Sequence, residues 1–445
     1  MELAKYIKDN LKYIFVRGDA NESTMTYVYT NGYYRLINDD EFKGFIKSFI
    51  PYQLRKSRDI NEVLFELKTE MNFVNYNDLN NNEDIINFQD GIYNILNDEF
   101  YPHSPDILST IQIPANYADI KNAPAEAPTF FKYAMTLVND DIETFELLMQ
   151  CLGVAISNIS GFKTKKALFL VGKGNTGKSQ IKRLAEYLIG QDNISNVDLK
   201  KLNDRFGTAS IYQKRLVGCN DMSYQRIEDM SIFKQLTGGD ALEIEFKNKA
   251  SFTFLYKGFL WFNCNKLPRF GGDTGKWVYE RIMPIFCNNV IPKEEQDPLL
   301  FEKMVKEKNT IINIALMELQ KVIKNNYHFI EPKNMEIERE KYGVENNTFL
   351  SFIKECCYIS DTILPSCRIR RSVFKDAYDK YVQINYNNKG KLNYADVKLI
   401  LENDFNEFCV KSNGNVYMSK INLTPEARAE LDIYDPDYYK INKDI

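Results

Sequence analysis

The stretch FLVGKGNTGKSQ, residues 169–180, limits the fold of this chain more than any other feature of the sequence. Four of its residues fit the pattern G-x-x-x-x-G-K-[ST]: Gly172, Gly177, Lys178 and Ser179. This pattern binds phosphate only when it lies between a buried strand and a helix. An apolar run at 167–171 precedes it, and apolar residues at helical spacing follow from 181 to 188, before Gly190. The sequence therefore predicts a strand, a loop and a helix, which together indicate an α/β fold.

A loop of this kind surrounds the phosphates of a nucleotide with backbone N–H groups at the positive end of the following helix. Gly172 and Gly177 permit the tight turn and the close approach of the backbone. Lys178 is expected to reach the β and γ phosphates, and Ser179 to hold Mg²⁺. The predicted nucleotide-binding residues are Gly172, Lys173, Gly174, Asn175, Thr176, Gly177, Lys178 and Ser179. The predicted cofactors are ATP and Mg²⁺, and a glycine-rich turn without a ligand is the weaker alternative.

Composition excludes several classes of protein. With 445 residues the chain is expected to form two to four domains. No apolar run approaches the roughly 18 residues of a membrane span, and the N-terminus lacks a signal-peptide core. Eight cysteines without C-x-x-C spacing and only two histidines argue against zinc and favour reduced thiols in cytoplasm. The net charge of -4 argues against a uniformly basic nucleic-acid coat, so any DNA-binding surface must be local.

The order of strand-like and helical patterns predicts how the chain is organised. Six segments are predicted: an α+β N-terminal domain at 1–115, a helical collar at 116–160, a P-loop core at 161–292, a helical connection at 293–344, a winged-helix-like domain at 345–423 and an acidic tail at 424–445. Within the collar the second amphipathic helix is expected at 141–157. The asparagine-rich stretch 75–84 is interpreted as an exposed loop. Three helices and an Asn-Gly hairpin at 412–415 favour the winged helix.

Two further features of the core bear on chemistry. A second core strand is predicted from 215 onward, and it ends at Asp221, which could support Mg²⁺ or activate water. Taken alone, an aspartate after a strand is more often a turn residue. Two alternating runs, at 242–245 and 251–254, predict a hairpin whose tip carries Lys247 and Lys249.

Three later stretches follow the loop in a fixed order: FKQLTGGDALEIEFKNKASFTF at 233–254, KGFLWFNCNKLPRF at 257–270 and WVYERIMPIF at 277–286. With them the chain resembles the superfamily 3 helicases, specifically the phage, plasmid and poxvirus primase-helicases. The matching residues are Lys234 to Asp240, Asn265 with Pro268, and Arg281. NFQDGIYNI, at 87–95, is also similar to the pre-motor domain of that family, so the resemblance covers roughly residues 30 to 290.

The resemblance implies an AAA+-like motor that hydrolyses ATP and assembles into hexameric rings. The catalytic residues that it implies are Lys178, Asp221, Asn265 and Arg281, with Ser179 and Asp221 holding the metal. Asn265 would orient the attacking water or sense the γ phosphate. Arg281 would act as an arginine finger on a neighbouring subunit's nucleotide. Asn220 departs from the family pattern, because members often have a second acidic residue there.

DNA contacts are expected in two places. In the resembling family the hairpin, here with Lys247 and Lys249, enters the ring channel and follows a DNA backbone, although a solvated turn would look the same in isolation. Candidate contacts of the winged-helix-like domain with origin duplex are Arg368, Arg370, Arg371 and Lys411. That domain carries 11 Lys and Arg against 9 Asp and Glu, a weak excess, so a protein contact remains the alternative.

These features together lead us to expect an ATP-dependent replicative DNA helicase of a phage, plasmid or other mobile element, in the host cytoplasm. Its expected partners are DNA, further copies of the chain and a separate primase or polymerase, with no membrane. Two alternatives stay open: an ATP-dependent origin-binding or assembly module without processive unwinding, and a primase-helicase partner. The region before the motor contains no D-x-D pair, which argues against a primase activity in this chain.

Overall fold

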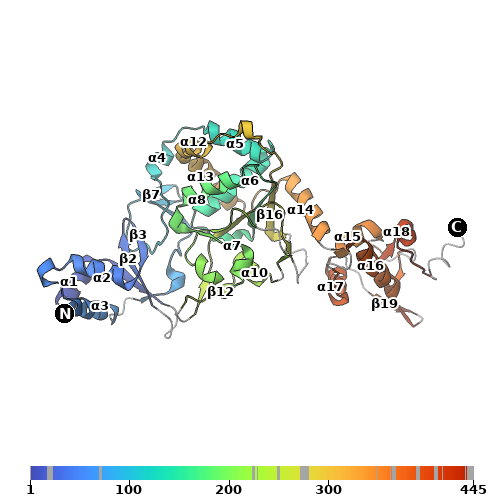
Figure 1. The fold of residues 1–445 in the computed structure, drawn as a ribbon, viewed down its shortest axis with the longest axis horizontal. Helices are drawn as coiled ribbons and strands as arrows, with labels where there is room; N and C mark the ends of the chain where they lie inside the picture. Colours follow the sequence, from blue (N-terminus) through green and yellow to red (C-terminus); the bar gives the residue numbers. More distant parts are fainter. Residues whose placement is uncertain are drawn as a thin grey trace. The chain divides into compact units, whose positions relative to one another are not determined.

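The chain folds into a mixed α/β structure with several sheets, seen here in a computed structural model (Figure 1). The structure describes residues 2–17, 24–69, 73–222, 226–227, 229–247, 251–270, 280–346, 348–360, 362, 367–386, 391–404, 409–412, 414–435 and 437. Two compact units divide it: Met1–Gly271 with Arg281–Met335, and Gly272–Glu280 with Glu336–Ile445. The six segments predicted from the sequence are a finer division than these two units, and their boundaries stay a prediction.

The first unit begins with a small α+β region. Its strands are β1 (Tyr13–Val16), β2 (Met25–Thr30), β3 (Tyr33–Ile37) and β4 (Phe73–Val74), in the order β3-β2-β1-β4. Its helices are α1 (Glu2–Asn10), α2 (Asp39–Ser48) and α3 (Ser57–Thr69), which pack with the sheet around a core that includes Phe15 and Phe42. Helix α2 begins at a capping box, in which Asn38 accepts from the backbone of Glu41 and Glu41 accepts from the backbone of Asn38.

A second antiparallel sheet and a group of helices follow. The elements are β5 (Ile85–Phe88), β6 (Gly91–Asn94), β7 (Glu99–Tyr101), α4 (Tyr117–Lys121), α5 (Pro128–Leu137), α6 (Ile142–Ile156) and α7 (Gly161–Thr164). The prediction of a helix at 141–157 is confirmed by α6. Most of its side chains are buried, because α13 (Lys308–Lys324) packs along it. The helix is therefore part of the largest apolar core of the chain.

A five-stranded parallel sheet forms the centre of the first unit. Its strands are β8 (Ala167–Val171), β9 (Ile194–Asn196), β10 (Leu216–Gly218), β14 (Phe259–Cys264) and β16 (Ile282–Phe286), in the order β16-β8-β14-β10-β9. Every residue of β8 and β14 is buried, which explains why both read as continuous apolar runs in the sequence. Helix α8 (Lys178–Ile189) follows the loop after β8, so the predicted strand, loop and helix are confirmed.

Between β10 and β14, the third and fourth of these core strands in the chain, the sequence forms an antiparallel hairpin. It consists of β12 (Ala241–Ile244) and β13 (Phe252–Leu255), and the predicted pairing is confirmed. Lys247 is exposed beyond β12, whereas Lys249 lies outside the described residues. At the end of the hairpin next to the connecting segment, where Phe252 pairs with Ile244, the ring of Phe252 stacks on Tyr76, with ring centroids 4.1 Å apart.

The interpretation of 75–84 as an exposed loop is wrong for its apolar and some of its polar residues. Tyr76 is buried because its ring stacks on the hairpin, and Leu79 is buried as well. Asn80 is buried because its side-chain amide donates to Thr110 and Gln213, at 2.7 and 2.6 Å. The segment therefore packs against the core through these three residues, while its other asparagines are exposed.

The remaining helices and strands of the first unit lie between the elements described above in the sequence or follow the last of them. They are α9 (Leu199–Leu202), β11 (Arg226–Ile227), α10 (Ser231–Gly238), β15 (Arg269–Phe270), α12 (Leu300–Lys306), the start of α14 (Lys333–Asn346) and the 3₁₀ helices η1 (Tyr52–Leu54), η2 (Tyr76–Asp78), η3 (Gln191–Asn193), η4 (Gly207–Ile211) and η5 (Lys293–Glu295). No helix in the described ranges is both long and apolar enough to span a membrane.

The second unit has its own apolar core. Its elements are α15 (Thr348–Cys356), β17 (Cys357–Ile359), β18 (Ile369–Arg370), α16 (Arg371–Tyr386), α17 (Tyr394–Asp404), β19 (Cys409–Ser412), β20 (Asn415–Met418), β21 (Ile421–Leu423) and α18 (Pro425–Glu430). Strands β18, β20 and β19 form one antiparallel sheet, in that order. Asn413 of the predicted turn lies outside the described residues, but the hairpin β19–β20 that flanks it is present. Leu431 and Ile433, from the predicted acidic tail, are part of this core.

One buried cation holds several parts of the first unit together. Arg215, which precedes β10, has only 2% of its surface exposed. Its guanidinium donates to the carbonyl oxygens of Lys257, Val154 and Ile159, at 2.8, 2.9 and 3.0 Å. Burial lowers the pKa of Arg215 to about 10.

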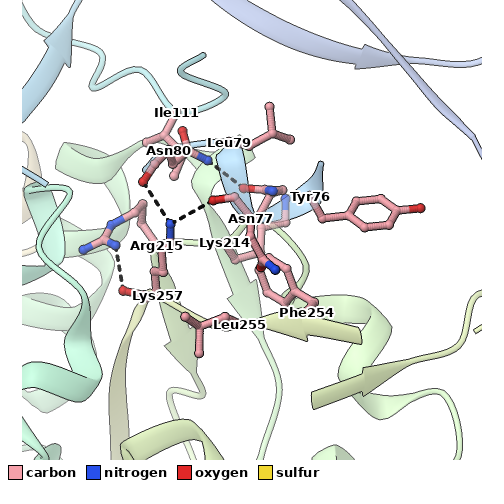
Figure 2. Close-up of a pocket in the computed structure, with 12 residues that line it drawn as sticks. Tyr76, Asn77, Leu79, Asn80, Ile111, Lys214, Arg215, Phe254, Leu255 and Lys257 are labelled. Carbon is pink, nitrogen blue, oxygen red and sulfur yellow. Dashed lines mark hydrogen bonds between the residues drawn. The ribbon is translucent and has the colours of Figure 1, made fainter. Parts of the chain in front are cut away.

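A second cation lies beside Arg215. Figure 2 shows that the ammonium of Lys257 faces the carbonyl oxygens of Asn77 and Asn80, 3.5 Å from each.

We expect Arg215→Lys to lower the free energy of unfolding by ~1–3 kcal/mol, because one ammonium cannot reach three carbonyl groups arranged for a planar fork. Urea denaturation followed by far-UV circular dichroism measures the change. Arg58→Lys is the matched control, since Arg58 is exposed on α3, and we expect it to stay within ~0.5 kcal/mol of the unmodified protein. Equal stabilities of the two variants would show that the three carbonyl contacts contribute nothing.

Candidate nucleotide-binding site

The loop between β8 and α8 depends on two of its three glycines. A Cβ atom on Gly172 would lie 2.2 Å from the carbonyl oxygen of Cys287, at the end of β16. Gly177 has φ 95°, in the region that side-chain-bearing residues rarely adopt. A Cβ atom on Gly174 would meet nothing within 4 Å. Position 172 therefore requires glycine because the loop lies so close to Cys287, and position 177 requires it because of its positive φ. Neither constraint applies to Gly174.

Lys178 lies in the first turn of α8 and folds back over the loop. Its ammonium donates to the carbonyl oxygens of Gly172 and Lys173, at 2.7 and 2.8 Å, and to the hydroxyl of Thr176 at 3.1 Å. Burial lowers the pKa of Lys178, while nearby groups that include Asp221 partly oppose this effect. The acceptors that the described part of the chain gives this ammonium are all neutral, and phosphate oxygens would offer it stronger, charged ones.

Ser179 and Asp221 are the predicted metal-binding residues. Ser179 follows Lys178 in the first turn of α8, and its side chain is exposed. Asp221 is also exposed and lies just beyond β10, close enough for its charge to raise the pKa of Lys178. A hydroxyl and a carboxylate match the oxygen ligands that Mg²⁺ prefers, so the donor set fits the predicted ion. Their role in metal binding stays a prediction.

Two asparagines, one within β14 and one just beyond its carboxyl end, lie in different environments. Asn265, the predicted catalytic residue, is exposed just beyond the carboxyl end of the strand. Asn263 is fully buried, and its amide donates to the carbonyl oxygen of Lys178 at 2.8 Å. The indole N–H of Trp261 donates to the side-chain oxygen of Asn263 at 3.1 Å. Asn263 therefore ties the start of α8 to the central sheet, a role that the sequence reasoning missed although a lone amide in an apolar strand was a usable signal.

Asn220, the departure from the family pattern, bridges two neighbouring elements. Its side-chain oxygen accepts from Asn263 and its amide donates to Glu186 of α8, both at 3.4 Å. Glu186 also pairs with Lys182, at 2.6 Å, and both side chains are buried. The amide of Asn220 thus contacts the carboxylate of Glu186, which is already paired with the ammonium of Lys182. An acidic residue at position 220 would face Glu186 at close range, which is a physical reason for a neutral side chain here.

Helix α5 also contacts the loop. The hydroxyl of Tyr133 donates to the carbonyl oxygen of Gly177 at 2.6 Å. Burial raises the pKa of Tyr133, so the phenol keeps its proton and remains a donor. The sequence reasoning did not single out Tyr133, because it comes from the predicted collar, 44 residues before its partner.

Arg281 lies at the opposite edge of the sheet from the loop. It immediately precedes β16, whose residues pair in parallel with β8 from Ala167 at the amino end to Val171 at the carboxyl end. Five residues of strand correspond to roughly 16 Å. The guanidinium donates to the hydroxyl of Thr237 and the carbonyl oxygen of Lys234, at 2.7 and 3.2 Å, at the end of α10. Arg281 and the loop of the same chain are therefore not brought together.

The predicted DNA-binding residues of the second unit gather near the β18–β20–β19 sheet. Arg371 and Lys411 are exposed there. The guanidinium of Arg368 lies over the ring of Tyr417, 3.8 Å from its centroid, and Arg370 forms an ion pair with Asp437. By contrast, α17 carries three acidic residues against one lysine. The four predicted residues thus lie in or beside the strands and at the start of α16, whereas α17 is acidic.

Comparisons with known families and structures cover both halves of the first unit. Residues 170–281 match a family of unknown function, DUF5906, and residues 19–137 match the family described as D5 N terminal like. The second match agrees with a relationship to phage primase-helicases and does not by itself show a helicase. Each match spans less than half of the chain.

The chain is also similar to two solved structures. The A form apo structure of the NrS-1 C-terminal region has 13% identical residues, with 94% of this chain and 98% of that chain covered and a TM-score of 0.48. The apo structure of the same region has 12% identical residues, with the same coverage of 94% and 98% and a TM-score of 0.49. At these scores neither likeness decides the fold or the activity of this chain.

Gly172→Ala should damage the loop, because the added methyl group must push the loop away from the carbonyl oxygen of Cys287. We expect a loss of ~1–3 kcal/mol in the free energy of unfolding and weaker binding of a fluorescent ATP analogue. Gly174→Ala is the matched control and should change stability by no more than ~0.5 kcal/mol, with ATP binding retained. If both variants bind the analogue like the unmodified protein, the loop is not the nucleotide site.

Proposed function

We propose that the chain is an ATP-dependent DNA helicase that works as a ring of identical subunits in the replication of a phage, plasmid or other mobile element. The observation that carries this proposal is the arrangement at the carboxyl edge of the parallel sheet. The phosphate loop leaves β8, Asn265 follows β14, and Asp221 follows β10, on three adjacent strands. Open parallel sheets bind ligands at this edge.

The chemistry at this edge suits hydrolysis of a nucleoside triphosphate. Ser179 and Asp221 would hold Mg²⁺, which would supply positive charge to offset the negative charge of the phosphates. Lys178 would hold phosphate oxygens, with Ser179 and Asp221 as the oxygen ligands. Asn265, exposed beside this edge, would orient the attacking water through a neutral amide. Asp221 would then be the one carboxylate of the pair that the resembling family carries, because Asn220 is neutral.

The position of Arg281 supports a ring. Lying at the amino edge of the sheet, it cannot reach the loop of its own chain, but it can face the loop of a neighbour. A guanidinium supplied in trans stabilises the charge of the transition state. We therefore assign Arg281 as an arginine finger, and a closed hexamer as the assembly in which every loop has one.

Two surfaces would contact DNA. The hairpin β12–β13 carries Lys247 and Lys249 in the segment between its strands, where flexible ammonium groups suit contact with successive phosphates. In the second unit, the order helix, two short strands, two helices and a hairpin supports a winged-helix-like domain. The acidic character of α17 favours contact through the strand side, with Arg368, Arg370, Arg371 and Lys411 as candidates. We also propose that the protein works in the host cytoplasm together with a separate primase or polymerase.

Lys178→Ala should lower ATP turnover at least ~100-fold and abolish strand separation, because the phosphates lose a directly placed positive charge. Phosphate release and unwinding of a forked duplex measure the two effects. Lys47→Ala is the control: it removes an exposed lysine of α2 that belongs to no proposed site, and it should keep both activities. Near-normal turnover in the Lys178→Ala protein would contradict the proposed helicase, and turnover without unwinding would favour an ATP-driven assembly module.

Mixing two inactive variants tests the finger. Arg281→Ala subunits keep an intact loop and Lys178→Ala subunits keep an intact finger, so mixed rings contain interfaces with both. We expect ATP turnover above the sum of the separate preparations when subunits exchange. The control mixture pairs Lys178→Ala with the double variant Lys178→Ala/Arg281→Ala, in which every loop is defective, and it should show no gain. Exchange without any gain in the first mixture would show that Arg281 does not act in trans.

A further inference from the structure

Three donor groups of the second unit converge on one carboxylate. The Nε and one terminal nitrogen of Arg370 donate to the two oxygens of Asp437, at 2.5 and 2.9 Å. The hydroxyl of Tyr417 donates to an oxygen of the same carboxylate at 2.8 Å. Arg370 and Tyr417 are paired residues on the neighbouring strands β18 and β20, so the sheet itself holds them side by side. The result is a preformed binding site for an oxyanion.

The second arginine near this site strengthens its positive character. Arg368 lies over the ring of Tyr417, and its carbonyl oxygen accepts from the amide of Asn422 at 3.2 Å. A cation over an aromatic ring is attracted by the electron-rich face of that ring, so Arg368 is held beside the hydroxyl-bearing residue of the site. Arg371, next in the chain after Arg370, is exposed.

A short segment of the chain delivers the carboxylate to this site. Asp435 is buried and pairs with Arg428, which is also buried, at 3.2 Å. The backbone N–H of Asp437 then donates to the side chain of Asp435 at 3.1 Å. This buried ion pair anchors the segment two residues before Asp437, so Asp437 is tethered at high local concentration beside Arg370.

The contact itself is open to competition. The side chains of Arg370 and Asp437 are 26% and 28% exposed, unlike the 5% and 3% of the anchoring pair of Arg428 and Asp435. Water and salt ions can reach an ion pair with this exposure and screen it. A guanidinium fork with an added hydroxyl donor fits the oxygens of a phosphate as well as those of a carboxylate. A DNA phosphate can therefore take the place that Asp437 holds.

We propose that Arg370 and Tyr417 form a phosphodiester-binding site and that Asp437 occupies this site as an intramolecular competitor, which lowers the affinity of the chain for DNA. The inference rests on the proposed function for the identity of the ligand, and it adds a site and a form of self-inhibition to that function. DNA that engages the second unit must displace Asp437, whereas a duplex held elsewhere on the chain leaves it in place.

The test uses the full chain with the substitution Asp437→Asn. Binding of a fluorescent duplex oligonucleotide, followed by anisotropy at several salt concentrations, should become ~3–10-fold tighter. The slope of log affinity against log salt should steepen by about 1, since one more phosphate is neutralised. Glu426→Gln is the matched control, because it removes one carboxylate from an exposed position on α18 with the same change in net charge. That control should keep the affinity and slope of the unmodified protein.

Two further measurements separate the proposal from a purely structural role of Asp437. The double variant Arg370→Ala/Asp437→Asn should not show the increase in DNA affinity, because it lacks the arginine that would bind the phosphate. Equal affinities of Asp437→Asn and Glu426→Gln would overturn the proposal, as would a lowered melting temperature of Asp437→Asn with unchanged DNA affinity, which would identify a purely structural clasp. ATP turnover without DNA, measured on the same preparations, should be unchanged by Asp437→Asn. Absence of turnover from every preparation would count against the proposed helicase and leave the DNA-binding comparison valid.

Discussion

The parallel direction of the five central strands is the constraint on which the first unit depends. Because all carboxyl ends meet at one edge, the phosphate loop, Asn265 and Asp221 follow adjacent strands toward the same place. Because all amino ends meet at the other edge, Arg281 is held away from that place. The parallel topology thus gathers the proposed nucleotide-binding groups at one edge and places the proposed arginine finger at the other.

Arg215 and Arg370 differ in role because their guanidinium groups have different hydrogen-bond partners. Arg215 is enclosed by backbone carbonyls that belong to three parts of the first unit, so its removal exposes several unsatisfied polar groups at once. Arg370 instead meets a single half-exposed carboxylate on a short segment. The first arrangement is rigid and structural, whereas the second can exchange one anion for another without disturbing the core.

Much of the candidate site followed from local sequence patterns. The loop, its strand and its helix were predictable because G-x-x-x-x-G-K-[ST] and its apolar flanks are contiguous, and the hairpin because strand alternation is a local property. Asn263, Tyr133 and Asp437 were not found, since each acts on a residue at least 20 positions away. The exposed-loop interpretation of 75–84 failed for the same reason, because Tyr76 is buried by a ring that lies far along the chain.

The sequence by itself determined which groups are available: a G-x-x-x-x-G-K-[ST] loop between a strand and a helix, a carboxylate after a strand, lysines between the strands of a hairpin, and three arginines just before or at the start of a helix. These follow from short-range spacing, which the period of a strand or helix imposes directly. Only the tertiary structure decided which of these groups meet. Strand order put Asn263 between the loop and Asn220, and chain folding put Asp437 onto Arg370, because contacts between distant residues depend on how whole elements pack and not on the residues beside them in the sequence.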